Sequence, residues 1–141
     1  MRVDGRVDYQ YIFDQSYTRV IERETFFDTF YQKFIESSPE VAAKFSSTDL
    51  KRQKRMLERS LGLMSMFHTD LGADEEMERI ARVHDENHHD IGADFYERWM
   101  DCLIEAVREC DPRCDSDVEL AWRMTLAPGI TYMKFRYQGV P

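Results

Sequence analysis

The sequence predicts a single all-α domain of six to eight helices. Apolar residues recur at helical spacing along most of the chain. Glycine and proline number only 6 and 4, and they fall mainly at the breaks between these apolar segments. We find no alternating strand pattern joined by a tight hairpin turn, and no repeat with a period of roughly 20–50 residues. We therefore expect one domain over residues 1–141, with residues 1–8 as a short N-terminal extension.

The net charge of the chain is −8, and 43% of its residues are hydrophobic, which is sufficient for a packed core. An acidic surface repels phosphates, so nucleic acids and anionic membranes are not expected partners. No apolar run approaches the roughly 18 residues of a membrane-spanning helix. The first residues also lack the apolar core of a signal peptide.

The three cysteines, Cys102, Cys110 and Cys114, do not have the spacing of a zinc site. An odd number of thiols is typical of a reducing compartment, so we expect a cytoplasmic protein. Cys110 and Cys114 are close enough in sequence to form a redox pair. The ordinary interpretation is that all three are small thiols in the core or in a loop.

The first two helices are predicted over residues 9–21 and 24–36. The inner side of the first carries Ile12, Phe13, Tyr17, Val20 and Ile21. The second has a wide apolar stripe formed by Phe26, Phe27, Phe30, Tyr31, Phe34 and Ile35.

Two capping signals start the next two helices. Ser38-Pro39-Glu40 combines a capping serine, a proline at the first position and an acid in the first turn, and it predicts a short helix that ends near Phe45. The segment that ends with Asp49 caps a longer helix, expected to reach about Phe67. The inner line of that helix consists of Gln53, Leu57, Leu61 and Met64, with Met56 alongside.

The helix predicted over residues 74–87 has an apolar face that ends at a histidine. Met77, Ile80, Ala81 and His84 share this face, and a polar segment follows. A histidine in this position is well placed to bind the metal of a flat apolar cofactor. A lone histidine on an apolar face is more often a packed core residue, so both interpretations stay open at this point.

The last two helices are predicted from residue 93 to 109 and from residue 116 to beyond residue 130. The inner face of the first carries Phe95, Trp99, Cys102, Leu103, Ala106 and Val107. Ser116 and Glu119 have the spacing of a capping box. Pro128 removes one backbone hydrogen bond, so we expect a bend there.

Several short motifs, in order along the chain, are similar to those of the globin family. They are Phe30-Tyr31-x-x-Phe34, Ser38-Pro39-Glu40, Phe45, Arg52-Gln53-x-x-Met56-Leu57, Ile80-Ala81-x-x-His84, Phe95-Tyr96-x-x-Trp99 and Ala121-Trp122. The chain thus resembles a bacterial single-domain globin of the branch that contains globin-coupled sensors and flavohaemoglobins. The resemblance covers nearly the whole chain and implies a three-over-three helical sandwich that holds haem b.

The resemblance also implies the residues of the haem site. His84 takes the position of the proximal ligand to the iron, and the carbonyl of Ile80 is the candidate partner of its second nitrogen. Tyr31, Gln53 and Leu57 take the positions of the distal wall. The residues expected to contact the haem are Phe45, Leu57, Leu61, Ile80, Val83, Ile91 and Phe95. The rival ligands are His88 and His89, for which a solvated loop is the ordinary interpretation.

Tyr31 and Gln53 offer a phenol and a carboxamide to a gas ligand. Both donate hydrogen bonds to the partly negative terminal oxygen of O2, and each bond contributes ~1–2 kcal/mol in a dry pocket. The alternative is that Tyr31 is a packed core aromatic and Gln53 a solvated residue near a helix start. Phenolate ligation of ferric iron by Tyr31 also stays open.

Four functions follow from the resemblance. The first is reversible binding of oxygen, nitric oxide or carbon monoxide, as in oxygen transport. The second is gas sensing through a separate partner protein, because only residues 137–141 follow the last helix. The third is an enzyme, a nitric oxide dioxygenase. Such an enzyme needs a separate reductase here, because the sequence has no dinucleotide-binding motif. Tyr137 disfavours this function, because flavohaemoglobins have a glutamate at the comparable position. The fourth is a haem-free interaction domain. The branch further implies a homodimer through the last two helices.

Overall fold

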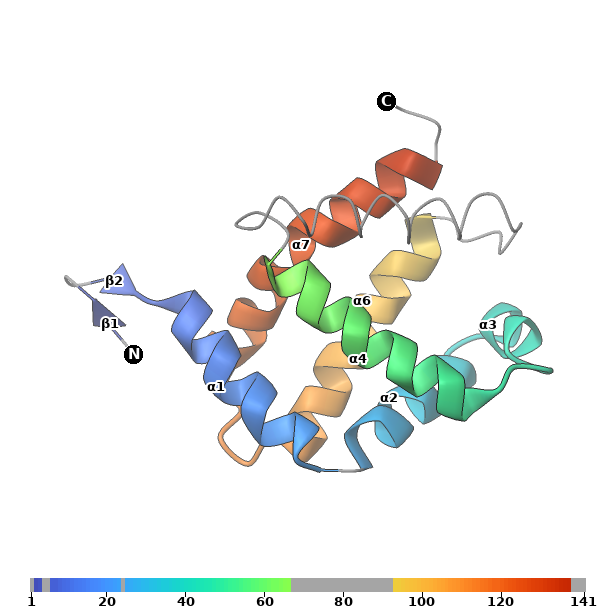
Figure 1. Ribbon diagram of the computed structural model, residues 1–141, viewed down its shortest axis with the longest axis horizontal. Helices are drawn as coiled ribbons and strands as arrows, with labels where there is room; N and C mark the ends of the chain where they lie inside the picture. The colour runs from blue at the N-terminus through green and yellow to red at the C-terminus, as the bar shows by residue number, and fades with distance from the viewer. Residues whose placement is uncertain (1, 4–5, 24, 67–92, 138–141) are drawn as a thin grey trace.

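The computed structural model describes residues 2–3, 6–23, 25–66 and 93–137 (Figure 1). The described elements are β1 (Arg2–Val3), β2 (Arg6–Val7), α1 (Tyr9–Ile21), α2 (Thr25–Glu36), α3 (Pro39–Lys44), α4 (Leu50–Met66), α6 (Ala93–Cys110) and α7 (Ser116–Tyr137). The helix bounds agree with the sequence prediction to within a few residues. The predicted helix over residues 74–87 lies outside the described residues.

The N-terminal extension differs from the prediction, because β1 and β2 pair as a short antiparallel ladder. Asp-Gly is a common hairpin signal, and Asp4-Gly5 separates the two strands in the sequence, so the expectation of no hairpin was wrong here. The ladder joins only two residue pairs, so the domain remains helical in its architecture.

The helices form two crossing layers (Figure 1). Within one layer α6 lies between α2 and α7. In the other layer, α1 and α4 both pack on α7. Figure 1 shows α4 running obliquely across α6 and α7, with its first turns on the side of α2 and α3. None of the described helices is both long enough and apolar enough to cross a membrane.

Aromatic rings from three helices meet at the centre of the core. The ring of Trp122 on α7 is fully buried, and it lies 4.8 Å from that of Phe13 and 6.0 Å from that of Phe26, between ring centroids. Each large ring removes apolar surface from water, and the edge-to-face contact of Trp122 with Phe13 adds to that gain. This cluster joins α1, α2 and α7.

The crossing of α4 and α7 depends on a small residue. A Cβ atom added to Gly129 would lie 2.6 Å from Cγ of Met64, closer than two carbon atoms tolerate. Glycine therefore lets the two backbones approach at this point. This contact fixes the second half of α4 on α7.

One local prediction was correct and two were wrong. The Ser38 side chain caps α3 by accepting a hydrogen bond from the Glu40 amide. By contrast, the start of α7 is capped by Asp115, whose carboxylate accepts a hydrogen bond from the Val118 amide, because the helix begins one residue earlier than a Ser116 cap requires. Met56, expected alongside the inner line of α4, is 45% exposed, since it lies to one side of the buried Leu57 and Leu61.

Candidate functional site

The described part of the predicted site is centred on Tyr31 of α2. Its ring is 4% exposed and lies between Phe30, at 4.9 Å, and Phe45, at 5.8 Å, measured between ring centroids. Phe45 follows α3 directly, and it also meets Phe34 at 5.9 Å. The aromatic stripe of α2 thus continues across the turn after α3.

The Tyr31 hydroxyl faces the start of α4. It donates a hydrogen bond to the backbone carbonyl of Gln53 at 3.2 Å. The sequence predicted that these two residues share a site, and the structure brings them together. Gln53 takes part in this contact through its main-chain oxygen, whereas the sequence predicted a role for its side-chain carboxamide.

The electrostatic state of Tyr31 follows from its burial. Burial raises the pKa of Tyr31 well above its usual value, and the side chain of Gln53 offsets only part of that rise. The phenol therefore keeps its proton at neutral pH and acts as a hydrogen-bond donor.

Apolar side chains from α4 and α6 extend the site away from Tyr31. Leu57 and Leu61 are 5% and 0% exposed and lie one and two turns beyond Gln53 on the inner face of α4. Phe95, near the start of α6, packs against the core while half-buried, and the Lys44 ammonium lies 5.3 Å from its ring centroid. These residues offer flat aromatic and aliphatic surface and, in Tyr31, one buried polar donor.

The remaining predicted site residues lie outside the described residues. They are Ile80, Val83, His84 and Ile91, together with the rival ligands His88 and His89. Among the described ones, Tyr31 contacts Phe45 and Gln53 directly, whereas Leu57, Leu61 and Phe95 share the same hydrophobic core. Among the described residues, no group of three or more potential metal-binding side chains is found.

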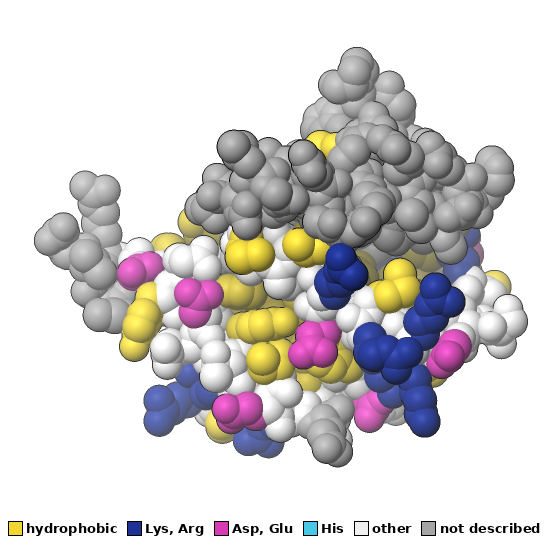
Figure 2. All heavy atoms as spheres, in the orientation of Figure 1, with side chains coloured by type: hydrophobic (Ala, Val, Ile, Leu, Met, Phe, Trp, Pro, Cys, Tyr) yellow, Lys and Arg dark blue, Asp and Glu magenta, His cyan; other side chains and the backbone are white. Residues whose placement is uncertain are grey.

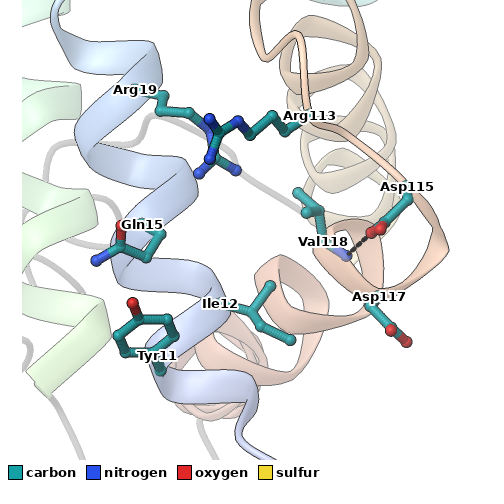
Figure 3. A pocket seen from close by; sticks show the side chains of 8 residues that line it. All are labelled: Tyr11, Ile12, Gln15, Arg19, Arg113, Asp115, Asp117 and Val118. Atoms are coloured by element: carbon teal, nitrogen blue, oxygen red, sulfur yellow. Dashed lines mark hydrogen bonds between the residues drawn. The ribbon is translucent and has the colours of Figure 1, made fainter. Parts of the chain in front are cut away.

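Away from the predicted site, a surface hollow lies between α1 and the turn that joins α6 to α7 (Figure 3). It encloses about 240 Å³ and is lined by Tyr11, Ile12, Gln15, Arg19, Arg113, Asp115, Asp117 and Val118. Figure 3 shows the Arg19 and Arg113 side chains converging from the two sides. This hollow shares no residue with the predicted site, and it borders the ion pair that joins Arg19 to Asp111.

Comparison with solved structures decides the family. The chain is 33% identical in sequence to a Pseudomonas aeruginosa protein that is described as structurally highly homologous to human hemoglobin. The similarity covers 92% of this chain and 98% of that one, and the two structures superpose with a TM-score of 0.86. This chain belongs to the globin family. The predicted all-α globin fold, with its three-over-three helical sandwich, is thereby confirmed.

No protein-family model and no curated protein sequence matches this globin. The family assignment therefore depends on the solved structure and on the ordered motifs. Because the superposition spans 92% of the chain, it includes most of the residues in α2, α3, α4, α6 and α7.

Proposed function

We propose that this globin binds haem b through His84 and reversibly binds a diatomic gas, oxygen above all, on the side that Tyr31 faces. Membership of the globin family supports the haem, and the buried phenol of Tyr31 beside Gln53 is the observation that carries the gas-binding proposal. The proposed bacterial branch, with its globin-coupled sensors and flavohaemoglobins, rests on the sequence motifs.

The described side chains fit a flat apolar cofactor. Phe45 and Phe95 supply aromatic surface, and Leu57 and Leu61 supply aliphatic surface. Haem, when bound, supplies the iron to which the gas binds. The role of His84 as the iron ligand is proposed from the sequence, where it closes an apolar helix face.

Tyr31 would act as a hydrogen-bond donor towards the gas. Its raised pKa keeps the phenol neutral, which favours donation over phenolate ligation of the iron. The Gln53 carbonyl holds the hydroxyl at the edge of α4, and a rotation about the phenol C–O bond redirects its proton. Burial makes such a bond stronger than it would be in water.

We also propose a homodimer through the last two helices. Leu120 and Met124 support it, because they lie one turn apart on α7 and are 42% and 51% exposed. The sedimentation velocity of the purified protein tests this proposal. Leu120→Glu combined with Met124→Glu should yield a monomer if the wild type is a dimer.

The haem proposal is tested by the absorption spectrum of the purified protein in its ferric, reduced and oxygenated forms. We expect a Soret band in each form and stable uptake of oxygen after reduction. His84→Ala should lose the pigment, whereas His88→Ala and His89→Ala should keep it. Pigment retained by His84→Ala would contradict the assignment of the ligand.

The same preparation separates the competing functions. Rapid consumption of nitric oxide in the presence of a reductant would identify a dioxygenase. No Soret band, even after added haem, would leave a domain that acts only through interactions. Stable oxygen binding without turnover supports the function proposed here.

A further inference from the structure

We propose that the ion pair between Asp28 of α2 and Lys54 of α4 positions the start of α4 over Tyr31 and thereby slows the movement of gas into and out of the pocket. We call this pair the α2–α4 latch. The inference rests on the proposed gas-binding function. Asp28 and Lys54 are positioning residues, because they act through Tyr31 and Gln53.

The latch lies beside the hydrogen bond of the proposed site. Lys54 directly follows Gln53 in the chain, and Asp28 precedes Tyr31 by three residues, which places both on one side of α2. The Lys54 ammonium contacts the Asp28 carboxylate, and the Tyr31 hydroxyl contacts the Gln53 carbonyl. Two neighbouring side-chain bonds therefore join the same two helices.

Among the elements that the structure describes, the first half of α4 has few close backbone neighbours. Its second half is fixed on α7 at the crossing of Met64 and Gly129, whereas its backbone does not pack closely along α2. Figure 1 shows the first turns of α4 extending past α2 towards α3. Among the described residues, the contacts between this end of α4 and α2 are made by side chains, and the latch is one of them.

The latch is open to solvent. The Lys54 and Asp28 side chains are 30% and 56% exposed, so dissolved salt screens their attraction. Exposed ion pairs contribute little free energy. If the start of α4 moves between a held and a displaced position, loss of the pair should raise the population of the displaced position roughly two- to fivefold. A small, salt-dependent effect on rates is therefore the expected signature.

The helix offers matched controls. Figure 2 shows lysine and arginine side chains gathered on one part of the face in view. In the sequence, the first half of α4 carries Lys51, Arg52, Lys54 and Arg55. Within the described part of the chain, neither Lys51 nor Arg55 has an ion-pair partner. Lys51→Met thus removes the same charge from the same helix without breaking the latch.

The experiment compares haem-loaded wild type with Lys54→Met, Asp28→Asn and the control Lys51→Met. Hydrogen exchange of the amides in residues 50–57 reports the position of the helix start, and stopped-flow mixing gives the association and dissociation rates of oxygen. We expect both latch variants to exchange faster in this segment and to raise both rates roughly two- to fivefold. Lys51→Met should match the wild type.

Conservative changes should restore the wild-type behaviour. Lys54→Arg and Asp28→Glu keep the ion pair, and the exchanged pair Asp28→Lys with Lys54→Asp re-forms it with reversed charges. High salt should raise the wild-type rates towards those of Lys54→Met. A purely structural role would not show this pattern of rescue.

Each contrary outcome has its own meaning. If the wild type binds no haem, the proposed function fails, and the exchange measurement on the same chain still tests the latch. If oxygen binds normally but Lys54→Met and Lys51→Met behave alike in exchange and in rates, the latch is overturned while the function stands. Faster exchange with unchanged rates would overturn its link to the gas.

Discussion

The indole nitrogen of Trp122 donates a hydrogen bond to the Ser16 hydroxyl at 2.9 Å, so the fully buried aromatic core contains a polar link between α1 and α7. Ser16 in turn donates to the Asp111 carboxylate at 2.6 Å. The same carboxylate accepts two bonds from the Arg19 guanidinium, at 2.7 and 2.9 Å. Asp111 thus joins α1 to the turn before α7.

Replacement of Asp111 by asparagine should destabilise the fold by about 1–3 kcal/mol, because Arg19 and Ser16 would lose a charged acceptor in a buried place. The carboxylate has no exposed surface, whereas Arg19 is 24% exposed and can recover some hydration, which limits the loss. Chemical denaturation gives the free energy of unfolding.

Asp101→Asn is the matched control for that experiment. Asp101 pairs with Arg123, but its side chain is 68% exposed. Its loss should change the free energy of unfolding by less than about 0.5 kcal/mol. Equal effects of the two substitutions would contradict the importance assigned to burial.

The loss of folding stability at low pH should depend on Asp111. Burial by itself would raise the pKa of Asp111, but hydrogen bonds from Arg19, Ser16 and the Arg113 amide outweigh burial and lower it. A lowered pKa stabilises the folded state at pH values above the unfolded pKa of about 4, and this contribution is lost as the pH falls through the folded value.

The free energy of unfolding, measured from neutral pH down to about pH 2, should therefore differ most between wild type and Asp111→Asn at neutral pH. The difference should shrink as the solution is acidified. A constant difference over this range would show that the carboxylate does not carry the pH dependence.

Substitution of Gly129 by alanine should destabilise the protein by about 1–3 kcal/mol, because the new Cβ would meet Cγ of Met64 at 2.6 Å. Gly62 on α4 is a matched control, since a Cβ there meets no atom within 4 Å. Gly62→Ala should stabilise the protein by about 0.5–1 kcal/mol through the helix propensity of alanine. Thermal melts should show a lower Tm for Gly129→Ala and a higher Tm for Gly62→Ala than for the wild type.

The sequence was a good guide to elements whose signals are local. Apolar periodicity and the Ser38 cap predicted the helices, because these patterns act within a few residues. The globin resemblance put Tyr31 and Gln53 in the same predicted site, and the two lie in contact in the structure. Periodicity by itself left Tyr31 as one aromatic residue in a stripe of them.

Contacts between distant residues could not be predicted from the sequence. Ser16 and Asp111 are 95 positions apart, and nothing in the sequence indicates that the two side chains meet. Its spacing from Phe13 and Val20 was the available clue, since it places Ser16 on their inner face. The ion pair of Asp28 with Lys54 likewise needs the two helices to be placed first.

Tyr31→Phe should raise the dissociation rate of oxygen about tenfold, because it removes one hydrogen bond of ~1–2 kcal/mol from the gas. The association rate should change far less, because the Asp28–Lys54 pair still joins α2 to α4 after the Tyr31–Gln53 bond is lost. This differs from the α2–α4 latch variants, which should raise both rates. Stopped-flow measurement of both rates distinguishes the two effects.

The chain supplies a matched control in Tyr17, whose hydroxyl also donates to a carbonyl of α4, that of Glu58, at 3.4 Å. Tyr17→Phe removes the same kind of bond from the same helix but outside the proposed pocket, so both oxygen rates should stay at the wild-type value. Because burial raises the pKa of Tyr31, the wild-type dissociation rate should also stay constant from neutral pH to about pH 10, the usual pKa of a tyrosine. An unchanged rate in Tyr31→Phe, or an equal rise in Tyr17→Phe, would remove the phenol of Tyr31 from the account of gas binding.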